Sequence, residues 1–309
     1  MVKAKVHEIE IDIRSNTLIG MYQYGETPSR LLIISGLRGD EGSSIFASYH
    51  LMKLLDAVDT LNGTVSIIPV ANPLAFRLGL PASPIDHLLL DKEFPGRKDG
   101  SITERLAWEL WNIAKEYDYV ITLHSSLSNS VLFGRCMYED NPSMRDIFAS
   151  MNLPYIVHDA GEPGKLFVEV SRYGIPAIDI VIPGNGSIID PRASMKVVDI
   201  LLEFLSTNGW LTKSEVTYSP SFLGRTTKII APAEGFFLPA KEPGEKILKG
   251  ESIGAIEGAG ELTVPISGLI LSVNYSRYVF KGDFIAEIAM HDSQQPAVRR
   301  QPIRIKEGL

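Results

Sequence analysis

Apolar residues in the first two thirds of the chain follow two patterns that predict strands. Ile9, Ile11 and Ile13 alternate with acidic residues, which is typical of a half-buried strand at the edge of a sheet. Four later segments are short and almost wholly apolar, as expected for strands that are covered on both faces. These segments are Leu31–Ile34, Val65–Val70, Tyr119–Leu123 and Ala177–Ile182.

Apolar stripes with helical spacing separate these strands. The stripes are Ile45 with Tyr49 and Met52, Leu106 with Leu110 and Ile113, and a third that begins within residues 195–202. Ser101 and Glu104 precede the second stripe with the spacing of a capping box, which predicts the start of that helix. Strands that alternate with helices predict an α/β domain over residues 1–210 with a doubly wound, mainly parallel sheet.

The pattern changes after Asn208 to short strands punctuated by glycine, which predicts a small all-β domain over residues 215–309. A weak internal repeat lies within this domain. Residues 232–237, followed by Lys-Gly at 249–250, resemble residues 265–270, followed by Lys-Gly at 281–282. Two such halves resemble a barrel-sandwich domain of the lipoyl and biotinyl type. The expected hairpin turn at 257–261 contains no lysine, so a covalent carrier role is not expected.

Composition narrows the classes of partner. The 309 residues carry a formal charge of −7, which offers no basic surface for nucleic acid or for an anionic membrane. A small-molecule partner is therefore expected. The single cysteine, Cys136, excludes an internal disulfide, and no apolar run is long enough to span a bilayer. With no signal-peptide pattern at the N-terminus, these features favour a cytoplasmic location.

Ligands of doubly wound sheets bind beyond the carboxyl ends of the strands, which directs attention to the loops that follow them. The chain carries Gly-Leu-Arg-Gly-Asp-Glu-Gly at 36–42, Asn-Pro at 72–73, Phe-Pro-Gly at 94–96, Thr-Glu-Arg-Leu-Ala at 103–107 and Leu-His-Ser at 123–125. In this order and spacing the motifs resemble the succinylglutamate desuccinylase/aspartoacylase family, and the resemblance covers nearly the whole chain. It implies an α/β fold of the zinc carboxypeptidase type followed by a C-terminal β domain.

The resemblance also implies a metal site. Members of that family hydrolyse N-acyl amino acids with a zinc ion, which is bound by a Gly-x-His-Gly-x-Glu loop and a later Leu-His pair. Glu41 matches the zinc glutamate and His124 the second zinc histidine. The first histidine falls on Arg38, whose guanidinium has no lone pair to donate to a metal. A third ligand would then have to come from Asp40 or Asp91.

Further departures fall on the positions that the family uses to hold and cleave its substrate. The Asp-Leu-Asn-Arg segment becomes Leu-Leu-Asp-Lys at 89–92, and an expected arginine falls on Pro81. The candidate substrate-binding residues are therefore Arg38, Asn72, Asp91 and Lys92. Lys92 keeps a positive charge without the planar fork of arginine, whereas Asp91 would repel an anion.

The catalytic glutamate of the family falls on Val181, which transfers no proton. Asp179 lies two residues earlier and projects from the same face of the strand, so it is the candidate for a displaced catalytic base. A carboxylate at this position could equally pair with Lys92 or cap a loop amide.

Two hypotheses follow. The first is a metal-dependent amidohydrolase of a small N-acyl amino acid, with zinc on Glu41, His124 and Asp40 or Asp91. The second is a non-catalytic descendant in which Arg38 takes the place of the metal, pairs with Glu41 and leaves a pocket for a carboxylate-containing small molecule. The sequence does not decide between enzyme and binding protein. It is compatible with a homo-oligomer without predicting one.

Overall fold

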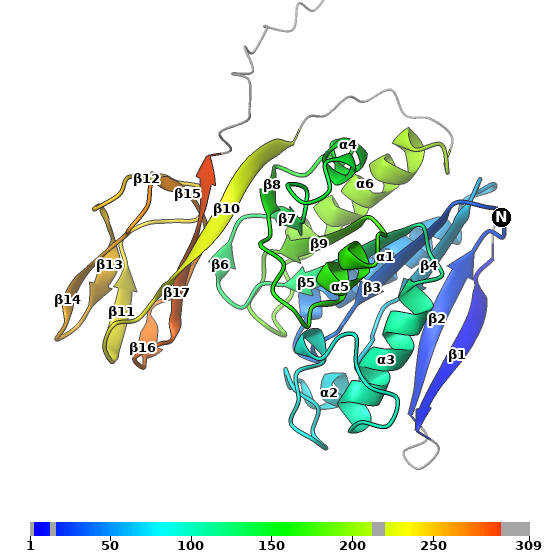
Figure 1. The fold of residues 1–309 in the computed structure, drawn as a ribbon, viewed down its shortest axis with the longest axis horizontal. Coiled ribbons are helices and arrows are strands. Elements are labelled where there is room, and N and C mark those ends of the chain that lie inside the picture. Colours follow the sequence, from blue (N-terminus) through cyan, green and yellow to red (C-terminus); the bar gives the residue numbers. More distant parts are fainter. Residues whose placement is uncertain (1–2, 13–16, 212–219, 292–309) are drawn as a thin grey trace, which may run out of the picture.

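The computed structural model describes residues 3–12, 17–211 and 220–291 (Figure 1). The N-terminal part, here called the α/β region, runs from β1 to α6. Its strands are β1 (Lys5–Asp12), β2 (Thr17–Tyr24), β3 (Arg30–Ser35), β4 (Thr64–Ile68), β5 (Tyr119–Ser125), β6 (Asn129–Ser130), β7 (Phe133–Cys136), β8 (Tyr155–His158) and β9 (Ala177–Ile182). Its helices are α1 (Gly42–Leu55), α2 (Pro73–Leu78), the 3-10 helix η1 (Leu90–Lys92), α3 (Ile102–Ala114), α4 (Ser143–Phe148), α5 (Leu166–Arg172) and α6 (Pro191–Thr207).

The four apolar segments predicted from the sequence form the centre of the large sheet, in the spatial order β4-β3-β5-β9. These four strands are parallel to one another, and β4 and β9 are buried along their whole length. The prediction of a mainly parallel sheet is corrected at both sides. Strand β2 pairs antiparallel with β1 and β4, and β7 pairs antiparallel with β9, so the sheet is mixed.

Helices cover the central strands in two groups, as the doubly wound prediction required. Helix α1 packs against α6 and against β3 and β5, whereas α5 packs against α3, β5 and β9. Helix α3 begins at the predicted capping box, in which the Ser101 hydroxyl accepts from the Glu104 N–H and the Glu104 carboxylate accepts from the Ser101 N–H. No helix among the described residues combines the length and apolar composition needed to cross a bilayer.

The C-terminal β region consists of β10 (Ser221–Ile230), β11 (Gly235–Pro239), β12 (Lys246–Ile247), β13 (Ser252–Ile256), β14 (Gly260–Thr263), β15 (Gly268–Val273), β16 (Arg277–Val279) and β17 (Phe284–His291). Strands β14-β13-β11-β16 form a second sheet, and an apolar core that includes Phe237, Ile253 and Ile270 belongs to this region alone. The likeness to a lipoyl-type domain stays a prediction.

The large sheet continues from one region into the other. Strand β10 pairs in parallel with β8, and β17, β15 and β12 follow it in the same sheet. The predicted boundary between the two domains lies between residues 210 and 215, and residues 212–219 lie outside the described residues. The described strands on either side of that boundary are joined by backbone hydrogen bonds rather than only by a linker (Figure 1).

Candidate functional site

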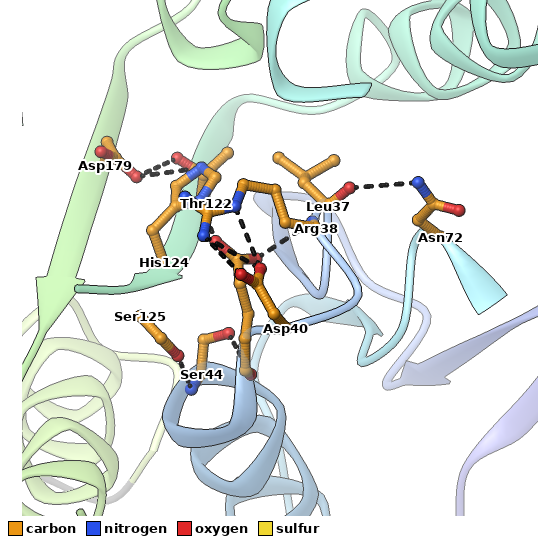
Figure 2. Close-up of polar contacts among 10 residues, drawn as sticks. Leu37, Arg38, Asp40, Ser44, Asn72, Thr122, His124, Ser125 and Asp179 are labelled. Carbon is orange, nitrogen blue, oxygen red and sulfur yellow. Dashed lines mark hydrogen bonds and ion pairs between the residues drawn. The ribbon is translucent and has the colours of Figure 1, made fainter. Parts of the chain in front are cut away.

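A cavity of about 530 Å³ lies where strands β5 and β9 end and the C-terminal β region begins. Among the residues that line it are Arg38, Asp91, Lys92, His124 and Asp179 from the α/β region, and Ser272, Arg277, Phe284 and Glu287 from the C-terminal β region. Five of the sequence-predicted site residues therefore meet in one cavity. Asp40 contacts Arg38 and Asn72 contacts Leu37 (Figure 2), and Glu41 contacts His124.

The loop between β3 and α1 is fixed by its close packing on α2. A Cβ atom on Gly39 would lie 2.1 Å from the carbonyl carbon of Ala75, so only glycine allows this approach. Asn72 caps α2 by accepting from the Ala75 N–H, and its amide donates to the Leu37 carbonyl at 3.4 Å. Asn72 is buried and does not line the cavity, so it holds the loop in place rather than contacting a ligand from the wall.

Glu41 and His124 contact each other directly. Oε1 of the fully buried Glu41 lies 2.5 Å from Nδ1 of His124, and Oε2 accepts from the Arg38 backbone N–H at 3.3 Å. On the other side of the ring, Nε2 of His124 lies 3.6 Å from Oδ1 of Asp179, which also accepts a 2.8 Å hydrogen bond from the Thr122 hydroxyl (Figure 2). The imidazole therefore lies between two carboxylates.

This arrangement determines the charge of His124. Burial alone would lower the pKa of the imidazole, but the carboxylates of Glu41 and Asp179 outweigh burial and raise the pKa to about 9. At neutral pH His124 is an imidazolium that donates from Nδ1 to Glu41 and faces Asp179 with Nε2 at ion-pair distance. Asp179 thus serves as its partner, and the alternative pairing of Asp179 with Lys92 is not present.

Arg38 pairs with its neighbour in the loop. Its Nε lies 3.1 Å from Oδ1 of Asp40, and its Nη2 lies 2.9 and 3.0 Å from the two carboxylate oxygens (Figure 2). This geometry corrects the expectation that the guanidinium pairs with Glu41, because only the Arg38 backbone reaches that carboxylate. It also commits the Asp40 oxygens to a cation that is already present.

Asp91 and Lys92 come from η1 and reach the cavity wall. The Oδ1 atom of Asp91 is buried without a hydrogen-bond partner among the described residues. Burial raises the pKa of Asp91 above its ordinary value, although the nearby positive charge of His124 opposes this effect. Lys92 makes no ion pair with any residue that the structure describes, so its charge is available to a ligand.

The donor set does not fit a catalytic zinc ion, which needs three protein ligands with lone pairs directed at one point. Arg38 has no lone pair, Asp40 is bound to Arg38, and the Glu41–His124 contact uses the Nδ1 atom on that side of the ring. Asp91, the other predicted third ligand, does not complete the set, because within residues 3–12, 17–211 and 220–291 no group of three or more His, Cys, Asp or Glu side chains could hold a metal ion. Val181, where the family resemblance predicts the catalytic glutamate, lines the cavity as an apolar residue.

Sequence reasoning missed three residues that the structure adds to the site: Thr122, Arg135 and Glu287. Thr122 lies two residues before His124 and so shares its strand face, a signal that was present in the sequence. Arg135 and Glu287 are charged residues within apolar strand segments. A charge in such a position is itself a signal, because a buried charge requires a partner.

Comparison with known proteins identifies the family of this chain. The model of the succinylglutamate desuccinylase/aspartoacylase catalytic domain matches residues 28–183, which contain every candidate site residue predicted from the sequence. The chain belongs to the succinylglutamate desuccinylase/aspartoacylase family. Family members are deacylases of N-acyl amino acids, and the family is generally zinc-dependent.

One curated relative is the N-alpha-acetyl-L-2,4-diaminobutyric acid deacetylase of Halomonas elongata, which is 39% identical over 102 residues. That match covers 33% of this chain and only 29% of the relative's own length.

Two solved structures resemble the whole chain in fold. The succinylglutamate desuccinylase/aspartoacylase of Rhodobacter sphaeroides has a TM-score of 0.83 at 20% identity, over 94% of this chain and 95% of that one. The product-bound ectoine utilization protein EutE (DoeB) of Ruegeria pomeroyi has a TM-score of 0.81 at 20% identity, with the same coverage. At this identity the likeness concerns the fold alone, and the zinc carboxypeptidase type stays a prediction.

Proposed function

We propose that this protein binds a small carboxylate-containing molecule in the cavity without a metal ion, with Arg38 at the position of the first metal ligand. The observation that carries the proposal is the direct contact between Glu41 and His124, at 2.5 Å. Two residues that hold one metal ion must both face it, whereas here they face each other. The site has thereby exchanged a metal ion for an imidazolium and a guanidinium.

The groups that remain in the cavity suit an anion. Arg38 uses its Nε and Nη2 on Asp40, so both N–H groups of its Nη1 have no acceptor among the described residues. Lys92 adds an ammonium that makes no ion pair with a described residue, whereas both ring nitrogens of His124 face carboxylates of the protein. A carboxylate placed beside Arg38 and Lys92 would accept charge-assisted hydrogen bonds, which are stronger than bonds between neutral groups.

Hydrolysis of an N-acyl amino acid is the second candidate, and family membership together with the 39% identity to a deacetylase favours it. In that reaction Asp179 would act as the base. The metal-dependent form of this candidate requires that His124 leave Glu41 and that a third ligand join them, either Asp40 after it leaves Arg38 or Asp91, whose Oδ1 has no hydrogen-bond partner among the described residues. Separating His124 from the buried Glu41 carboxylate would leave that charge unpaired, so we rank this candidate below anion binding.

The deciding experiment combines three measurements on one preparation purified without chelator. Elemental analysis measures bound metal before and after incubation with zinc, calorimetry measures binding of succinate, and an amine-release assay measures hydrolysis of N-acetyl amino acids. We expect substoichiometric metal, succinate binding and no turnover. Lys92→Met should weaken succinate binding, whereas Lys98→Met, at a lysine outside the cavity lining, should not. Stoichiometric zinc with turnover would overturn the proposal in favour of the hydrolase.

A further inference from the structure

A second arginine lies in the cavity wall, on the side that faces the C-terminal β region. Arg135 on β7 donates from Nη1 and Nη2 to the two carboxylate oxygens of Glu287 on β17, and both distances are 2.7 Å. The pair is largely buried, with side-chain exposures of 16% for Arg135 and 4% for Glu287. Both residues line the cavity.

A purely structural link between the two regions explains only part of this arrangement. An arginine has five N–H donors, and Glu287 accepts from two of them. The other three have no acceptor among the described residues. The guanidinium carbon lies 4.8 Å from the centre of the Phe133 ring, which limits its movement. The Arg135 side chain lines the cavity and keeps 16% of its surface exposed, so a ligand there can supply acceptors to these N–H groups.

Arg135 lies next to Asp179, one of the residues of the candidate functional site. Strand β7 pairs with β9 so that Arg135 lies opposite Asp179, and side chains of directly opposed residues project from the same face of a sheet. Asp179 thus has His124 on one side and Arg135 on the other. Burial would lower the pKa of Arg135, but Glu287 outweighs burial and raises that pKa above its ordinary value.

We propose that Arg135 is a second anchor for the ligand, which presents an oxyanion group to the three remaining N–H donors, and that Glu287 is a positioning residue that holds Arg135 in place. This inference rests on the proposed binding function and adds to it the chemistry of the ligand's far end. The end of the ligand that faces the C-terminal β region carries a carboxylate or a phosphate.

The test must separate anchoring from a structural role, because loss of either partner leaves a buried charge and destabilises the fold. The informative variant is therefore the double replacement Arg135→Met with Glu287→Met, since apolar residues of similar volume often replace a buried ion pair without loss of stability. Calorimetry with succinate and with inorganic phosphate measures binding, and thermal unfolding measures stability. Arg225→Met, at an exposed arginine outside the cavity lining, is the matched control.

We expect the double variant to unfold near the wild-type temperature but to bind the probe at least about tenfold more weakly, which corresponds to the loss of one charge-assisted hydrogen bond. Arg135→Lys, which keeps the charge and loses the fork, should also bind more weakly. Glu287→Gln should bind more weakly than wild type and more tightly than the double variant.

Other outcomes separate the two proposals. Wild-type affinity in the double variant would overturn the anchoring role, and the pair would then only join the two regions. If the double variant does not fold, wild-type affinity in Arg135→Lys would overturn the anchoring role in its place. Failure of the wild-type protein to bind either succinate or phosphate would instead count against the proposed function.

Discussion

Oε1 of Glu41 and Nδ1 of His124 lie 2.5 Å apart, and Glu41 is fully buried beneath the imidazole. The two residues come from different elements, the loop before α1 and the end of β5, and are 83 positions apart in the chain. Their contact joins into one ion pair the two residues that the family resemblance predicts as metal ligands.

This ion pair predicts a dependence of stability on pH. The pKa of His124 is raised to about 9, from about 6.5 in an unfolded chain, by the carboxylates of Glu41, Asp179 and Asp91 against the effect of burial. A raised pKa contributes stability that is fully present below about pH 6.5 and is lost as pH rises through about 9. Chemical denaturation across this range should show a falling free energy of unfolding. A His124→Gln variant with the same decline would contradict this assignment.

Arg38→His introduces the histidine that the family resemblance predicts in this loop, and it removes the cation that holds Asp40. We expect this variant to bind zinc much more tightly than wild type, because a third lone-pair donor then joins Glu41 and His124. Elemental analysis after incubation with zinc measures the effect, with Arg38→Met as the control that removes the charge without adding a ligand. Equal zinc content in all three proteins would show that Arg38 does not stand at the metal position.

Gly39→Ala should destabilise the fold, because the new Cβ would lie within 2.1 to 2.4 Å of backbone atoms of Ala75 and Phe76. Backbone cannot move away as a flexible side chain can, so we expect a loss of about 1–3 kcal/mol in the free energy of unfolding. Gly224→Ala is the matched control, since its Cβ would meet only ordinary contacts at 3.5 Å or more. A wild-type unfolding midpoint for Gly39→Ala would contradict the packing of this loop on α2.

Ser101→Ala removes the hydroxyl that caps α3, and the Glu104 N–H then loses its acceptor. Loss of such a cap costs about 0.5–2 kcal/mol. Urea unfolding should show this loss, whereas Ser276→Ala, at an exposed serine of the C-terminal β region, should be neutral. The prediction fails if the two variants unfold at the same urea concentration.

The features that the sequence predicted well are the local ones. The capping box of Ser101 and Glu104 spans four residues, and apolar runs such as Ala177–Ile182 report directly that both faces of a strand are covered. Strand direction is different, because an apolar run has the same composition whichever way its neighbour points. The antiparallel pairing of β7 with β9 was therefore not predicted.

In the candidate site, too, the sequence predicts residues that stand in local motifs but not the contacts between distant residues. Glu41, His124 and Asp179 were found because each stands in a motif or two residues from one, and the structure brings them together. The prediction that Arg38 pairs with Glu41 is wrong, because Arg38 pairs with Asp40. Asp40 and Glu41 carry the same charge at adjacent positions, so only the loop conformation selects between them. Arg135 and Glu287 are 152 positions apart, so no local pattern could pair them.

The ladder between β8 and β10 has a mechanical consequence. Four residue pairs, from Ser221 with Tyr155 to Arg225 with His158, join the two regions that enclose the cavity. A ladder of this kind resists hinge opening, because the regions cannot separate without breaking backbone hydrogen bonds that no water inside the sheet would replace. The ladder therefore opposes a hinge motion that would widen the cavity by separating the α/β region from the C-terminal β region.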